Sequence, residues 1–198
     1  MRWDNLFDDL ESQLEQGISA EELDLGAEEE RLRIGRLTMR DRLEAVHESG
    51  TGDARGVAVT LANDLRLVLR PVTFGRDWFS ADIIDDSSRR AQCIVPLAAV
   101  SGLGLSAGQV AASVRVTAKA EHPPLSSRLS VSFVLRDLCR RRRSLTVVLA
   151  VGEWHGTIDR VGREHLDLAV HEQGSARRDS AVLEYRVIPL DRIVLVRL

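Results

Sequence analysis

The sequence predicts a mainly β protein with a helical N-terminal arm, in which two small five-stranded barrels follow one another and a helix precedes each barrel. Three observations lead to this fold class. Short segments rich in β-branched residues alternate with Gly and Pro turns through most of the chain. Three sequence phrases recur, in the same order, in the two halves of the chain. The N-terminal segment instead carries apolar residues at helical spacing.

The internal repeat consists of three weak matches. Their offsets are 92, 87 and 93 residues, so they differ only by insertions the size of a loop. Because the matches keep the same order in both halves, we expect two copies of one structural unit. The matched pairs are RLTMRDRLEAV (36–46) with RLSVSFVLRDL (128–138), GRDWFSADI (75–83) with GREHLDLAV (162–170), and CIVPLAAVSGL (93–103) with RVIPLDRIVLV (186–196).

Residues 1–27 are predicted to form an acidic amphipathic arm. Their apolar residues recur every three or four positions, which places them on one stripe of a helix: Trp3, Leu6, Phe7, Leu10 and Leu14. Two interpretations remain open. The stripe covers the chain's own barrels, or Trp3, Leu6, Phe7 and Leu10 insert into a groove of a partner protein.

The first barrel is predicted over residues 28–104. A helix over residues 28–48 presents Leu32, Leu37, Leu43 and Val46 to the core. Pro71 lies inside an expected strand, which indicates an edge position or a bulge. Residues 105–124 are expected to be a plain linker. The strands of this half are predicted over 56–62, 65–74, 77–84, 91–97 and 99–103.

The second barrel is predicted over residues 125–198. Its helix has Leu129, Phe133, Val134 and Leu138 at helical spacing, with Ser126 or Ser127 as N-cap. Five strands then follow, separated by Gly, polar and Pro turns. They are expected over 145–151, 154–161, 164–171, 181–188 and 190–198.

Charge is distributed unevenly along the chain. The net charge is −3, but residues 1–50 carry 14 acids against 6 bases and residues 127–198 carry 13 bases against 9 acids. Arg140, Arg141, Arg142 and Arg143 form the densest basic run, and arginines in such a run bind phosphate groups. The alternative is a solvated helix end, because cations are favourable at a helix C-terminus.

Two phrases give the resemblance to a known family. A helix and five strands with GTIxxVGxxHLxL (156–168) and VIPLxxIVxV (187–196) resemble the Sm-like small β-barrel superfamily, whose barrel is SH3-like. The opening, MRWDNLFDDLESQLE, is also similar to the start of a protein family of high-GC Gram-positive bacteria, which implies no activity. The Sm-like resemblance implies two tandem Sm-like barrels that bind single-stranded RNA through two loops of each barrel.

The resemblance can be carried over residue by residue. It places one RNA-binding loop at residues 161–165 in the second half and at 74–78 in the first half. The family's base-contacting Asn and the Arg-Gly of its second loop are absent here. The resemblance therefore implies base stacking by Trp78 or His165 and phosphate contacts from Arg76 and Arg163, rather than uridine-specific binding.

The chain carries no sequence motif of an enzyme or a cofactor site. His165 and Asp167 share one face of a strand, where a ladder of solvated polar residues is the expected arrangement. The two cysteines are expected to be free thiols in a reducing cytoplasm, and we expect neither a secretory signal nor a membrane span. We therefore expect a non-catalytic cytoplasmic module without cofactor or metal. It binds single-stranded RNA or DNA or, alternatively, it is a protein adaptor that uses the acidic arm; self-association remains open.

Overall fold

The computed structural model describes residues 25–50, 56–84, 91–115, 124–174 and 177–198. These residues fall into two units, the first ending at Thr38 and the second running from Met39 to Leu198. The arm residues Trp3, Leu6, Phe7 and Leu10 lie outside the described residues, so their role stays a prediction. None of the helices in the described ranges is both long enough and apolar enough to cross a membrane.

The helix predicted over residues 28–48 is interrupted. One helix covers residues 25–35, and α2 (Met39–Glu48) starts after a turn at Arg36. Gly35 stands at the end of the first helix, where glycine commonly terminates helices. Leu43 and Val46 of α2 are fully buried as expected, but Leu32 in the first helix is exposed. The sequence pattern therefore located the buried face of α2 correctly and extended the helix too far toward the N-terminus.

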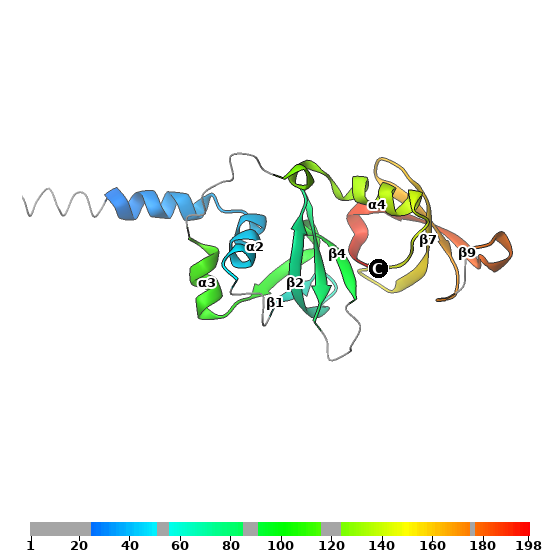
Figure 1. Cartoon of the computed structure of the whole chain (residues 1–198), viewed down its shortest axis with the longest axis horizontal. Coiled ribbons are helices and arrows are strands. Elements are labelled where there is room, and N and C mark those ends of the chain that lie inside the picture. The colour runs from blue at the N-terminus through cyan, green and yellow to red at the C-terminus, as the bar shows by residue number, and fades with distance from the viewer. Residues whose placement is uncertain (1–24, 51–55, 85–90, 116–123, 175–176) are drawn as a thin grey trace, which may run out of the picture. The chain divides into compact units, whose positions relative to one another are not determined.

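The second unit is mainly β, and its ten strands form one antiparallel sheet (Figure 1). The strands agree with those expected from the sequence to within a few residues at their ends. The first half contributes β1 (Val57–Leu61), β2 (Arg66–Phe74), β3 (Trp78–Ile83), β4 (Gln92–Pro96) and β5 (Val100–Gly104). The second half contributes β6 (Ser144–Leu149), β7 (Glu153–Val161), β8 (His165–Val170), β9 (Glu184–Pro189) and β10 (Ile193–Arg197).

The strands follow the order β5-β1-β2-β3-β4-β10-β6-β7-β8-β9. Within each half the last strand lies beside the first, so the same order occurs twice. The two halves meet where β4 pairs antiparallel with β10, with Ile94 opposite Val196 and Cys93 opposite Arg197. The amide of Leu198 extends this ladder by donating to the carbonyl of Gln92 at 2.8 Å.

The sheet is open, and the prediction of two closed five-stranded barrels is not confirmed. Strand β4 has its backbone partner in β10 of the other half rather than in β5 of its own half. Since a strand at an edge needs a partner for its backbone groups, pairing across the halves satisfies β4 without closing either half. This leaves β5 and β9 as the outer strands of the sheet.

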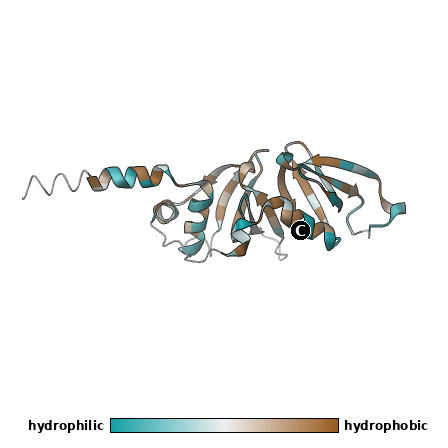
Figure 2. Ribbon diagram, turned by 90° about the horizontal axis from the view of Figure 1, so that it is seen from above, coloured by the Kyte–Doolittle hydropathy of each residue, from teal (hydrophilic) through white to brown (hydrophobic). Residues whose placement is uncertain are grey.

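Two apolar cores hold the second unit together, and each draws residues from both halves. Trp78 and Ile94 belong to the core formed mainly by the second half, while Val148 and Leu195 belong to the core of the first half. Burial alternates along β1, which starts buried-exposed-buried, and Figure 2 shows both hydrophobic and hydrophilic residues on the strands. The cores therefore join the two halves in addition to the β4–β10 ladder.

One local feature differs from the sequence analysis, and another agrees with it. Part of the expected plain linker folds into α3 (Ala107–Ser113), because Ser106 and Gln109 form a capping box at its start. The bulge expected from Pro71 is confirmed, since the β2–β3 register shifts between Pro71 and Thr73. A proline cannot donate to the ladder, and the bulge accommodates it.

Candidate nucleic-acid interface

The helix α4 (Val131–Arg140) packs one face against the sheet and leaves the other in solvent. Leu135 and Leu138 are buried in the core beneath it. Phe133, Arg136 and Arg140 follow a spacing of three and four residues and are all exposed, so they share the outer face. The sequence spacing groups Phe133 with Leu138, but Phe133 is 47% exposed.

The start of α4 is capped by the first half of the chain. The amide of Val131 donates to Oδ1 of Asp77 at 2.8 Å, and the amide of Arg76 donates to the Leu129 carbonyl at 2.9 Å. The N-cap residue is Ser130, whose side chain caps no amide, so the prediction of Ser126 or Ser127 is wrong. A carboxylate therefore occupies this helix N-terminus, where the helix dipole favours negative charge.

The basic run lies at the C-terminal end of α4. Arg140 and Arg141 each donate to a carboxylate oxygen of Asp137, at 2.8 and 2.6 Å. Arg142 turns the chain toward β6 with a left-handed backbone (φ 51°) and donates to Asp159 at 2.8 Å. The guanidinium groups nevertheless remain on the surface, because the side chains of Arg140, Arg141 and Arg142 are between 61% and 73% exposed.

Two carboxylates balance only part of this positive charge. Hydrogen bonds from Arg141 and Arg140 hold the pKa of Asp137 below its usual range. Arg177 donates twice to Asp159, at 2.7 and 2.6 Å, and together with Arg142 lowers the pKa of that carboxyl. Both acids are therefore charged at neutral pH. Residues 131–143 still contain five arginines and one acid.

The loop between β7 and β8 joins the same surface. Arg136 donates to the carbonyl of Gly162 at 3.0 Å, which fixes this loop beside α4. The next residue, Arg163, has a side chain that is 95% exposed and lies 3.9 Å from Glu164. His165 is also exposed. We call the group of Phe133, Arg136, Arg140–Arg143 and Arg163 the α4 surface.

The sequence-predicted residues fall into three groups. Arg140 to Arg143 and Arg163 lie on the α4 surface, with His165 next to Arg163 in the chain. Arg76 is exposed, but it stands at the start of α4, at the opposite end from the arginine run. Trp78 is only 5% exposed, and its indole Nε1 donates to the Leu129 carbonyl at 3.0 Å. The prediction that Trp78 stacks on bases is therefore wrong, because its ring is part of the core.

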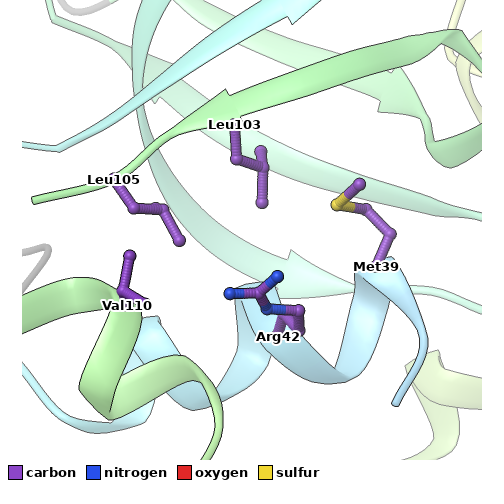
Figure 3. Close-up of a pocket in the computed structure, with 5 residues that line it drawn as sticks. All are labelled: Met39, Arg42, Leu103, Leu105 and Val110. Carbon is purple, nitrogen blue, oxygen red and sulfur yellow. The ribbon is translucent and has the colours of Figure 1, made fainter. Parts of the chain in front are cut away.

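Sequence reasoning missed Phe133 and Arg136 as surface residues. In the structure both share a helix stripe with Arg140 rather than with Leu135 and Leu138. The structure also contains a cavity of about 300 Å³ between α2, α3 and β5, which we call the hollow (Figure 3). Its lining is mostly apolar: Met39, Arg42, Leu103, Leu105 and Val110.

No buried side-chain nitrogen or oxygen in the described ranges lacks a hydrogen-bond partner. Both cysteines are free thiols, Cys93 in the core and Cys139 partly buried, as expected. Three or more His, Cys, Asp or Glu side chains that could share a metal ion do not come together anywhere in these ranges. Asp167, next to His165 on the expected polar ladder, lies 3.8 Å from Arg160 across the strands.

The chain was compared with protein-family models, with curated proteins and with solved structures, and none of the three comparisons found a match.

Proposed function

We propose that this chain is a non-catalytic cytoplasmic module that binds single-stranded nucleic acid, RNA or DNA, on the α4 surface. The observation that carries the proposal is the concentration of arginines there. Five arginines in residues 131–143 face one acid in the same segment, and Arg163 stands beside them on the β7–β8 loop. Guanidinium groups bind phosphate oxygens through paired hydrogen bonds, and such contacts supply most of the affinity for a nucleic-acid backbone.

The existing ion pairs do not block this role. The pairs of Arg140 and Arg141 with Asp137 are solvent-exposed, and exposed ion pairs contribute little to stability. A phosphate can therefore compete for the same guanidinium groups. Phe133 offers an exposed ring on the same helix face, on which a base can stack irrespective of its identity. His165 provides a second, smaller stacking group near Arg163.

The proposal includes the relationship between the two halves. We interpret them as two copies of one Sm-like barrel unit, arranged in tandem. The repeated order of strands and the three sequence matches with offsets of 92, 87 and 93 residues support this interpretation. Only the second copy carries the arginine run, because the positions of Arg140 to Arg143 correspond to residues 48–51 in the first copy, where the sequence is Glu-Ser-Gly-Thr.

Fluorescence anisotropy with a mixed-sequence single-stranded RNA and its DNA counterpart tests the proposal. The full chain is titrated at several salt concentrations, and the slope of log affinity against log salt is measured. Replacing Arg140, Arg141 and Arg143 by Gln should weaken binding and flatten this slope by about 0.7 for each lost phosphate contact. The matched control replaces three exposed arginines elsewhere by Gln: Arg66, Arg115 and Arg192.

Phe133→Ala separates stacking from charge. It should weaken binding by about 1–3 kcal/mol and leave the salt slope unchanged, because it removes no phosphate contact. Equal losses in the arginine variant and in its control would contradict the assignment to the α4 surface. If the full chain binds neither nucleic acid even at low salt, the proposal fails. The alternative function, a protein adaptor whose partner binds the acidic arm, would then lead.

A further inference from the structure

The β4–β10 junction shows how an edge of one half accepts an edge of the other. In it, Ile94 of β4 stands opposite Val196 of β10, and the two side chains are 3% and 0% exposed. Trp78 lies beside them in the same apolar cluster. The junction therefore combines a short antiparallel ladder with apolar contacts between residues of both halves.

Each side of this junction has a counterpart at an outer edge of the sheet. The offset of 93 residues maps β4 onto β9 and β5 onto β10, so that Ile94 corresponds to Val187 and Leu103 corresponds to Val196. Burial supports this mapping at positions away from the edges. Val95 and its counterpart Ile188 are both buried.

The counterparts differ in exposure because nothing in the described residues pairs with β9 or β5 on their outer sides. Val187 is 68% exposed, whereas Ile94 is 3% exposed. Leu103 is only partly buried, whereas Val196 is fully buried. The two outer edges thus carry the apolar residues of the junction without the partner that covers them.

The turn before β8 shows the same relationship. His165 corresponds to Trp78, and both rings lie so close to the glycine of their own turn, Gly162 or Gly75, that a Cβ atom there would approach the ring within 3 Å. The rings therefore take equivalent positions. Trp78 is buried against the other half, and His165 is exposed.

The hollow of Figure 3 is the counterpart of the place that Trp78 and Ile94 occupy in the junction. In the junction they share an apolar cluster with Val131 and Val134 of α4, with Val196 of β10 and with Leu198, which follows β10. The offsets of 92 and 93 residues map these four onto Met39, Arg42, Leu103 and Leu105. All four counterparts line the hollow between α2 and β5.

We propose that the occupant of these edges is a second copy of this chain, whose β9 pairs antiparallel with β5 of the first copy. The register follows from the junction and places Val187 of one copy opposite Leu103 of the other, and Arg186 opposite Gly104. His165 of the same copy enters the hollow of its neighbour. The contact is independent of nucleic acid and adds a self-assembly surface to the proposed function.

The chemistry of the β5 edge suits this pairing. The outer side of β5 carries no charge and no proline, the two features that usually protect an edge strand from pairing. Val110 of α3 adds an apolar wall to the hollow, and Arg42 turns its guanidinium toward Ser113, to which it donates at 2.9 Å. Because different surfaces meet, the contact is head-to-tail and repeats from copy to copy, either closing into a ring or growing as a filament.

Sedimentation velocity of the full chain tests the proposal over about a hundredfold range of concentration, since association shifts with concentration by mass action. The wild type should form species larger than the monomer as concentration rises. Val187→Asp and Leu103→Asp should each stay monomeric, because each replaces an apolar contact of the new interface by a charge. Val151→Asp is the matched control, since Val151 is 84% exposed and lies on neither edge, and this variant should associate like the wild type.

A mixture of the two edge variants gives the sharpest outcome. Each retains one intact edge, so Val187→Asp and Leu103→Asp should form a one-to-one complex and nothing larger. Met39→Asp replaces Leu103→Asp if the latter unfolds, because an acid is favourable in the first turn of α2. A wild type that stays monomeric throughout would overturn the proposal. The proposal would also be overturned if Val187→Asp abolished association while Leu103→Asp and Met39→Asp left it intact. That result would indicate pairing of β9 with β9.

Discussion

Corresponding positions are buried in the junction between β4 and β10 and exposed at the two outer edges of the sheet. In the junction, Trp78 and Ile94 are buried against the other half. At the outer edges, the corresponding His165 and Val187 are exposed. The difference teaches that burial at these positions depends on whether a neighbouring edge is present.

The residue types at the junction and at the outer edges match this difference in burial only in part. The buried site carries Trp, the residue with the largest apolar surface, and the exposed site carries His. Position 187 nevertheless keeps a β-branched apolar residue, as position 94 does. An edge strand that only faces solvent does not require an exposed valine at this position.

The largest expected effect comes from breaking the junction at Trp78. Trp78→Ala should lower the free energy of unfolding by about 3–5 kcal/mol, because it leaves a cavity in a packed core. His165→Ala, at the corresponding exposed position, should change it by no more than about 0.5 kcal/mol. Urea denaturation of dilute protein measures both values. Similar losses for the two variants would contradict the difference in burial.

The second effect uses the thiol at the centre of the junction. Burial raises the pKa of Cys93 to about 12, so the folded protein keeps the thiol neutral while the unfolded chain ionises it near its ordinary pKa of about 8.5. The stabilisation is complete below the unfolded pKa and is lost as pH rises toward the folded pKa. Between pH 7 and about 10, wild type should lose about 2 kcal/mol more stability than Cys93→Ala.

Denaturation curves of both proteins at the two pH values measure this difference. Equal pH dependence of wild type and Cys93→Ala would show that solvent reaches the junction thiol.

The third and smallest effect concerns the helix cap that crosses the halves. Asp77→Ala should cost about 1 kcal/mol, the usual value of an N-cap, because the Val131 amide loses its acceptor. Asp77→Asn should retain most of the stability, since Asn also caps helices. Glu164 corresponds to Asp77, and its side chain is 83% exposed. Glu164→Ala should therefore have little effect on the dilute protein, and an equal loss would contradict the comparison.

The strands could be predicted from the sequence because β-branched runs between Gly and Pro turns are local signals. The pairing of β4 with β10 could not be predicted, since it depends on whether β4 pairs with β5 of its own half or with the corresponding β10 of the other half. For the same reason Trp78 was predicted to be a surface residue, although the other half covers it. Its role is decided by a contact 51 residues away, with Leu129.

The candidate interface, too, could be predicted only in part from the sequence. The arginine run was evident from its composition, and the structure places it at the exposed end of α4. The contribution of Phe133 was hidden because an aromatic residue at helical spacing predicts a core position. The boundary of the core on α4 depends on how the helix is rotated over β7, which follows from packing rather than from the helix sequence alone.

Hydrogen–deuterium exchange at low and high protein concentration tests most directly whether the outer edges are open counterparts of the junction. Amides of β4 and β10 should be protected at both concentrations, because the junction is internal. Amides of β5 and β9 should exchange rapidly in dilute protein and become protected in concentrated protein. Exchange at β5 and β9 that is the same at both concentrations would contradict the account.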